Sequence, residues 1–125
     1  IIMSQSTVLQ LLPQTVYIND GTNNPYDVTG NTVQAASYYL GSQDLQTLSL
    51  NFSGVTGNLV VEASLANPPT ADSDWFQVYR LSANNQANVN SNTSSYQNLT
   101  GNFVNMRAKI EDFAHGTVQY VKISY

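Results

Sequence analysis

The side chains best suited to chemistry are few in this chain, and their spacing does not assemble a reaction centre. His115 is the only histidine. A catalytic histidine needs a nucleophile or a carboxylate placed around it, and a metal site needs further ligands. His115 instead lies in the segment DFAHG, which is typical of a hairpin turn. The sequence also contains no GxSxG elbow and no Gly-rich loop with a lysine that would cradle a phosphate. It therefore predicts no catalytic residue and a protein that is not an enzyme.

Oxygen ligands for calcium could come from one acidic turn, ADSD, with help from a second loop. The Gly-containing twelve-residue calcium loop with its terminal Glu is absent from the sequence. We therefore interpret Asp72 and Asp74 as residues that make turn hydrogen bonds before the next strand, and we predict no metal and no cofactor. The oxygen-bearing residues considered are Asp72, Ser73, Asp74, Asp20, Asn24 and Asp27.

Sugar chemistry and sugar binding give weak signals. Glycoside hydrolysis needs two carboxylates across the scissile bond, but Glu62 projects from an expected strand and the pair Glu111–Asp112 begins an expected turn. Eight tyrosines and one tryptophan could form a stacking platform for sugars. In a β-protein of this size, core or interface roles are favoured for these rings. Carbohydrate binding through exposed tyrosines near Tyr79 or Tyr96 is kept as the alternative.

Charge is sparse and excludes some partners. Charged residues make up 10% of the 125 residues, the formal net charge is −4, and Ser, Thr, Asn and Gln together number 49. Four Lys and Arg residues cannot neutralise a long run of phosphates, so we predict no nucleic-acid partner. No apolar run approaches the roughly 20 residues of a membrane span, so we predict no membrane partner. The start, IIMSQSTVLQLL, lacks the basic flank and long apolar stretch of a signal peptide.

Apolar and polar residues alternate with a period of two through most of the chain, as in strands. No segment shows the spacing of three to four residues between apolar positions that is typical of an amphipathic helix. The segments TGNLVVEASL (residues 56–65) and TGNFVNMRAKI (residues 100–110) both begin with Thr-Gly-Asn and then alternate. We expect both strands to start at a turn in which Gly57 and Gly101 adopt a positive φ. Further strands are expected at residues 7–12, 14–18, 33–40, 44–52, 74–81 and 117–125.

The loops that separate these strands indicate the fold class. Loops are expected at residues 19–31, 66–74, 82–95 and 111–116, the third of them rich in Asn and Ser, and Pro13 places an edge or corner near the start because it lacks an N–H. Many short strands separated in this way predict an all-β single domain, an antiparallel β-sandwich or jelly roll. The residues expected in its core include Leu59, Val61, Trp75, Val104, Met106 and Ile110.

The second part of the chain resembles small β-sandwich virion proteins of tailed bacteriophages. The resemblance covers roughly residues 53–125: the strand TGNLVVEASL, a Pro-containing loop, a strand opening on DSDWFQV, then TGNFVNMRAKI and HGTVQYVKISY. It implies a virion structural protein of the head decoration (cement) type, on the outer surface of the capsid. The implied partners are the major capsid protein or further copies of this chain. Neck, tail and fibre positions are alternatives of the same family.

The first eighteen residues lie outside this resemblance and have two interpretations. Residues 1–18 are apolar and broken by Pro13, so they could form a docking arm that pairs along the sheet edge of a neighbour. They could equally form the first strands of the chain's own domain. We accordingly divide the chain into residues 1–18 and a β-sandwich domain of residues 19–125.

Overall fold

A computed structural model describes residues 8–18, 25–38, 44–84 and 92–125. Nearly all of the described chain is β-strand, and the one helical element within these ranges is a single 3-10 turn. The prediction of an all-β single domain with antiparallel strands is confirmed. The elements are β1 (Val8–Leu12), β2 (Thr15–Val16), β3 (Tyr26–Thr29), β4 (Val33–Gln34), β5 (Leu45–Ser64), η1 (Asp72–Asp74), β6 (Trp75–Asn84), β7 (Asn92–Thr100) and β8 (Asn105–Ser124).

Two long strands, β5 and β8, organise the sheet. They pair antiparallel with each other, and the strand order is β1-β8-β5-β6. On the side away from β5, β8 pairs with β1, β2, β3 and β4 in turn. On the side away from β8, β5 pairs with β7 and then with β6. Because β5 and β8 run through the whole molecule, all eight strands belong to one continuous sheet. The separate sheets of a sandwich or jelly roll therefore stay a prediction.

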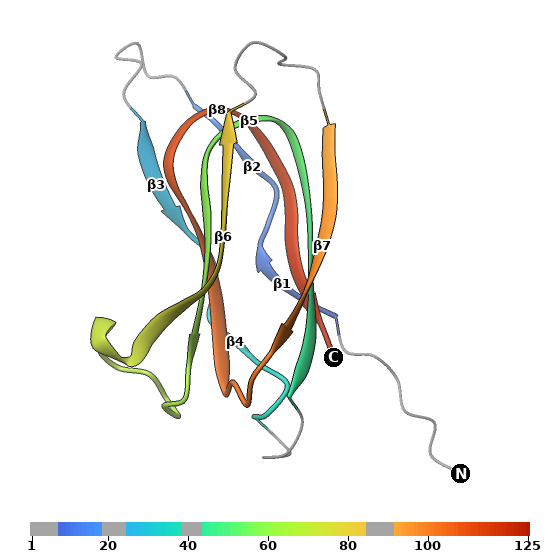
Figure 1. The fold of residues 1–125 in the computed structure, drawn as a ribbon. Helices are drawn as coiled ribbons and strands as arrows, with labels where there is room; N and C mark the ends of the chain where they lie inside the picture. Colours follow the sequence, from blue (N-terminus) through green and yellow to red (C-terminus); the bar gives the residue numbers. More distant parts are fainter. Residues whose placement is uncertain (1–7, 19–24, 39–43, 85–91) are drawn as a thin grey trace.

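The sheet bends over at the middle of β5 and β8, which Figure 1 shows at the top of the view. Four residues in the irregular segments at the bend have a positive φ: Gly54 (61°), Gly57 (158°, as expected from the sequence), Asp112 (54°) and Gly116 (91°). Gly116 is needed because a Cβ at this position would collide with the carbonyl of Gly54. The bend divides the sheet into a β7 half (β7, residues 45–53 and 117–124, β1 and β2) and a β6 half (β6, residues 56–64 and 105–111, β3 and β4).

The core lies between these two halves. Alternate residues of β5 and β8 point into it from both sides of the bend, as the period-two pattern predicts. Four of the predicted core residues are fully buried: Leu59, Val61, Met106 and Ile110. The largest buried side chains that accompany them are Phe52, Phe113, Leu11, Leu12, Leu48, Leu50 and Ile123.

Trp75 and Val104 were wrongly placed in the core. In β6 the register shifts between the partners of Val61 and Glu62, so that Val61 pairs with Tyr79 but Glu62 pairs with Gln77. The extra residue inverts the faces, and Trp75 lies half-buried on the outer surface. Val104 precedes the first residue of β8 and is also half-buried.

The two Thr-Gly-Asn segments have different roles, which corrects the expectation that each starts a strand at a turn. The first, residues 56–58, lies inside β5, so the expected strands 44–52 and 56–65 are one strand. The second connects β7 to β8, and Gly101 does not adopt a positive φ. In the same way the expected loop 111–116 belongs to β8, because its irregular residues form the bend rather than a hairpin turn.

The other predicted strand and loop boundaries agree with the structure in part. The segment at residues 66–74 is a connection, as expected, although its last three residues form η1, which was not expected; Pro13 lies between β1 and β2 at the edge of the sheet. Two strands were missed, since β3 falls within the expected loop 19–31 and β7 overlaps the expected loop 82–95. Of the expected strand 33–40, residues 33–34 form β4, residues 36–38 form a turn, and residues 39–40 lie outside the described residues.

The N-terminal residues that the structure describes belong to the chain's own sheet. β1 and β2 pair with β8, and Leu11 and Leu12 are buried in the core. Residues 1–7, which include the rest of the docking arm considered above, lie outside the described residues.

Candidate functional site

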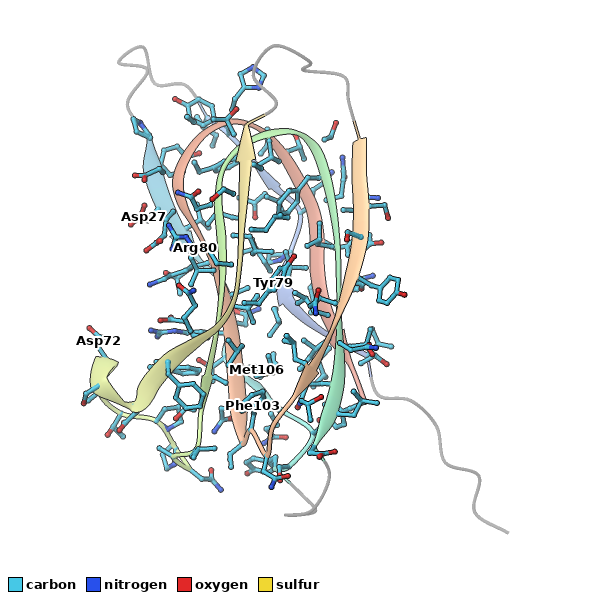
Figure 2. All side chains as sticks on the ribbon, viewed as in Figure 1. Asp27, Asp72, Tyr79, Arg80, Phe103 and Met106 are labelled. Atoms are coloured by element: carbon cyan, nitrogen blue, oxygen red, sulfur yellow. The ribbon has the colours of Figure 1, made fainter. Side chains whose placement is uncertain are left out.

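A groove of about 350 Å³ lies on the open side of the molecule that β6 and β7 border. Both strands pair with the same side of β5, one before and one after the bend, so they border the same opening between the two halves. Figure 2 shows Tyr79 and Phe103 in the space between the β6 and β7 ribbons. The described residues that line the groove are all uncharged: Val78, Tyr79, Gln97, Asn98, Leu99, Thr100 and Phe103.

The inner face of β7 explains why the groove is open. Residues directly opposite each other on paired strands share one face of a sheet. Gln97 lies opposite the buried Leu48, and Ser95 lies opposite the buried Leu50, so both polar side chains occupy inward positions. Both are nevertheless exposed. The strand therefore presents a polar wall where a fully closed core would require apolar side chains.

The groove combines aromatic rings with hydrogen-bonding groups. Tyr79 and Phe103 are half-buried and contribute ring surface, while Gln97 contributes an amide. The amide nitrogen of Gln97 donates to the backbone carbonyl of Asn98 over 3.3 Å. Within the described part of the chain, neither the Gln97 Oε1 atom nor the Tyr79 hydroxyl has a hydrogen-bond partner, so both can serve a ligand.

The outer face of the β6 half carries an ion ladder that runs across β6, β5 and β8. Glu62 accepts a hydrogen bond from Arg107 Nε at 2.9 Å and lies 3.7 Å from Lys109 Nζ. Lys109 also lies 3.6 Å from Glu111, which forms a second ion pair with Arg80 at 3.3 Å. The Arg107 guanidinium lies 4.3 Å from the centre of the Trp75 ring, a cation–π contact. Each charge in the ladder thus has a partner of opposite charge within 4 Å, and the Arg80–Glu111 pair reaches from β6 across β5 to β8.

The outer face of the β7 half is different, and we call it the neutral face. Cross-strand pairing places one row of Tyr96, Ser49, Lys122 and Gln10 on it and a second row of Asn98, Thr47, Ser124 and Val8. Lys122 is the one charged residue in these rows, and it lies over the ring of Tyr120 at 4.4 Å. Four large exposed side chains point outward on this half: Val8 (60% exposed), Val16 (54%), Leu45 (52%) and Tyr96 (71%).

The single histidine occupies the bend. His115 lies opposite Thr56 of β5, and its Nδ1 atom lies 3.2 Å from the carbonyl oxygen of Gly54. This contact ties the bend of β8 to the bend of β5. The prediction that His115 has a local structural role fits this position, although the residue belongs to a strand rather than to a hairpin turn.

The acidic residues considered as ligands lie apart. Figure 2 shows Asp72 at the tip of the β5–β6 connection and Asp27 on β3, well separated in the view. Asp27 accepts a hydrogen bond from the backbone N–H of Asp112 at 3.0 Å. Among the described residues no group of three His, Cys, Asp or Glu side chains could hold a metal ion. Asp20 and Asn24 lie outside the described residues.

Asp74 makes the turn hydrogen bonds that its position predicts. Its Oδ2 atom accepts from the backbone N–H groups of Thr70 at 2.8 Å and Ala71 at 3.0 Å. These two donors stabilise the carboxylate and hold the pKa of Asp74 below its usual range, with the Thr70 hydrogen bond as the larger cause. The carboxylate is thus part of the turn before β6.

Sequence reasoning missed the groove because it assigned the first part of β7 to the loop 82–95 and expected no strand in the rest. The segment NTSSYQNLT has an apolar inward residue only at Leu99, while its inward positions at Ser95 and Gln97 are polar, which hides it from a search for apolar alternation. Tyr79, which was named for the carbohydrate alternative as an exposed tyrosine, is half-buried and lines the groove, whereas Tyr96 lies on the outer face of β7. Phe103 and Gln97 were not considered.

Comparisons with known proteins give no family for this chain: no protein-family model matches it, and no curated protein matches it. The described residues also include no helix with the length and apolar character needed to cross a membrane.

Proposed function

We propose that this chain is a non-enzymatic structural protein of a tailed-bacteriophage virion, which decorates the outer surface of the head. It binds the major capsid protein, further copies of itself, or both, through the neutral face. The observation that carries the proposal is the contrast between the two outer faces of the sheet. One face satisfies its charges internally, while the other presents exposed apolar side chains among neutral polar ones.

The composition of the neutral face is that of a protein–protein interface. Depletion of charge at the centre and the presence of aromatic and aliphatic side chains are typical of interfaces between proteins. Val8, Val16, Leu45 and Tyr96 are all more than half exposed and share this face. A single cation, Lys122, leaves little charge repulsion between neighbouring copies. Copies packed side by side on a shell gain avidity from several modest contacts of this kind.

The edge of the sheet beside the neutral face supports the same function. β1 ends the strand order, and residues 8–18 contain no Lys, Arg, Asp or Glu. Natural edge strands are usually protected by charge, by proline or by a covering segment. Here the described protection consists of Pro13 and one hydrogen bond from the N–H of Asn31 to the carbonyl of Leu11 at 2.9 Å. An edge of this kind can pair with a strand of a neighbour.

The contacts of the acidic side chains support a function that does not involve catalysis. Glu62 and Glu111 both bind Lys109 in the ion ladder, and Asp74 binds backbone N–H groups of its turn. These groups have structural partners of their own. The resemblance of residues 53–125 to phage virion proteins supplies the particle context.

The proposal is tested first on particles. Virions of the phage whose genome carries this sequence are purified and analysed by mass spectrometry and cryo-electron microscopy. We expect the chain in many copies on the outer surface of the head. A ring of a few copies at the neck or tail would place it there instead, and purified particles without the chain would refute the virion role.

The docking surface is tested with charge substitutions at exposed positions. Val16→Glu and Tyr96→Glu should weaken co-sedimentation of the purified chain with heads that lack it, because each places an unpaired charge in an apolar contact. Leu65→Glu is the matched control, since Leu65 is 63% exposed but lies at the start of the connection from β5 to β6. If the Leu65→Glu variant loses binding as strongly as the other two, the neutral face is not the docking surface.

A further inference from the structure

We infer that the groove between β6 and β7 is a binding site for a neutral oligosaccharide. The site is built from Tyr79, Phe103 and Gln97 on the open side of the folded sheet. It borders the neutral face, the outer surface of the β7 half, and shares Asn98 with it, but its rings and the Gln97 amide belong to the groove alone. The inference goes beyond attachment to a particle and does not depend on it.

The lining has the chemistry that recognises sugars. A sugar ring has an apolar C–H face, which stacks on an aromatic ring, and hydroxyl groups that need donors and acceptors. Tyr79 and Phe103 supply the rings, and the Gln97 Oε1 atom and the Tyr79 hydroxyl supply polar groups that have no partner among the described residues. A volume of about 350 Å³ lies near the lower end of the roughly 300–1,000 Å³ range of small-molecule sites. The groove is therefore suited to a short saccharide.

The ligand class follows from the charge of the lining. None of the described lining residues is charged, so phosphate, sulfate and carboxylate groups would find no counter-ion there. A neutral sugar loses no ionic solvation on entering such a site. We therefore assign neutral oligosaccharides and not sialylated or phosphorylated ones.

An extended peptide is the competing occupant, and the inner face of β7 disfavours it. A peptide strand that closed the opening would continue the core, and the positions facing it would be apolar. The inward positions at Ser95 and Gln97 are polar and exposed instead, opposite the buried Leu50 and Leu48. This pattern keeps the wall of the groove hydrated and favours a ligand rich in hydroxyl groups.

The experiment measures binding by the purified full chain to an array of neutral and anionic oligosaccharides. The strongest neutral oligosaccharide on the array is then titrated into ¹⁵N-labelled protein, and an unstructured apolar peptide is titrated as the comparison. We expect neutral binders, with chemical-shift changes concentrated at residues 78–79, 97–100 and 103. An array without neutral binders, a preference for anionic sugars, or binding of the peptide alone would overturn the inference.

Variants then locate the site. Tyr79→Ala and Gln97→Ala should each weaken binding by roughly fivefold, the loss expected for one ring contact or one hydrogen bond. Tyr96→Ala and Gln77→Ala are the matched controls, because Tyr96 and Gln77 are exposed on outer faces of the sheet. Both controls should bind as the unmodified chain does.

Two outcomes would move or remove the site. Loss of binding in Tyr96→Ala with full binding in Tyr79→Ala would place the sugar on the neutral face and refute the groove. Tyr79 also packs against the core, so its variant is checked by circular dichroism. If it unfolds, the exposed Gln97 decides the result, and unchanged binding in Gln97→Ala refutes the site. Neither outcome bears on particle attachment, which the sedimentation experiment tests separately.

Discussion

Replacement of Gln46 by leucine should destabilise the fold strongly, because this side chain connects three segments at the base of the sheet. Gln46 is fully buried. Its Oε1 atom accepts from the backbone N–H of Ala36 at 3.2 Å. Its Nε2 atom donates to the carbonyls of Asp44 at 2.9 Å and Leu99 at 3.0 Å, with a longer contact of 3.3 Å to Gly101. One amide on β5 therefore binds the β4–β5 connection, the end of β7 and the β7–β8 connection.

The magnitude follows from these contacts. In Gln46→Leu the buried N–H of Ala36 loses its acceptor, which costs about 1–3 kcal/mol, and two short donated bonds are lost at about 1 kcal/mol each. Leucine fills a similar volume, and its additional apolar burial offsets about 1.5 kcal/mol of this. The net loss in free energy of unfolding should be about 1.5–3.5 kcal/mol.

Urea unfolding measures this loss, with the fluorescence of Trp75 as the probe and circular dichroism as the check on a two-state transition. Gln77→Leu is the matched control, because Gln77 is exposed on the outer face of β6 and should change stability by less than about 0.5 kcal/mol. A Gln46→Leu variant as stable as the Gln77→Leu variant would show that the backbone groups find other partners, and the reasoning would fail.

Three further predictions concern the bend and the turn before β6. Gly116→Ala should cost about 2–3 kcal/mol or more, because Gly116 has a φ of 91° and a Cβ would collide with the carbonyl of Gly54; unchanged urea unfolding would contradict this. Thr56→Val should raise the free energy of unfolding by about 0.5–1 kcal/mol, because the buried Thr56 hydroxyl has no hydrogen-bond partner among the described residues; a lower value would contradict it. The lowered pKa of Asp74 means that its contribution is complete above the ordinary aspartate pKa and is lost as pH falls through the folded-state value. Asp74→Asn should therefore flatten the acid side of the stability profile, and an NMR titration midpoint for Asp74 at or above that of an unfolded-chain aspartate would contradict this.

The alternation of apolar and polar residues along single segments was sufficient to predict an all-β fold. Alternation in the segments around Leu59, Val61, Met106 and Ile110 placed these residues in the core, and each is fully buried. A strand repeats every two residues, so one buried face can be recognised without knowing its partner. The acidic turn at residues 71–74 was equally predictable, because Asp74 bonds to backbone groups only three and four residues away.

The same pattern could not show how the strands connect. The irregular residues around Gly54 and Gly116 have the composition of turns, yet β5 and β8 continue through them. Whether such a segment reverses the chain or only bends it depends on the pairing of the two strands with each other over their whole length. That pairing joins residues far apart in the sequence. No local signal contains it.

The candidate site shows the same limit. Tyr79 was recognised as an aromatic residue of interest, but the groove around it depends on a register shift opposite Val61 and on the inward position of Gln97. The register shift inverted the predicted faces of β6 and moved Trp75 to the outer surface, beside Arg107. The start of β7 was interpreted as part of a loop because residues 82–95 are rich in Asn and Ser.

The sequence by itself determined the inner residues of β5 and β8, the neutral composition of the surface and the scarcity of charge. These are properties of individual residues and of their nearest neighbours along the chain. The tertiary structure alone decided that β5 and β8 are continuous, that the charges of β5, β6 and β8 pair in one ladder, and that β6 and β7 border a groove. The physical reason is that strand register is a property of pairs of strands, and a shift of one residue exchanges the inner and outer faces of a whole segment.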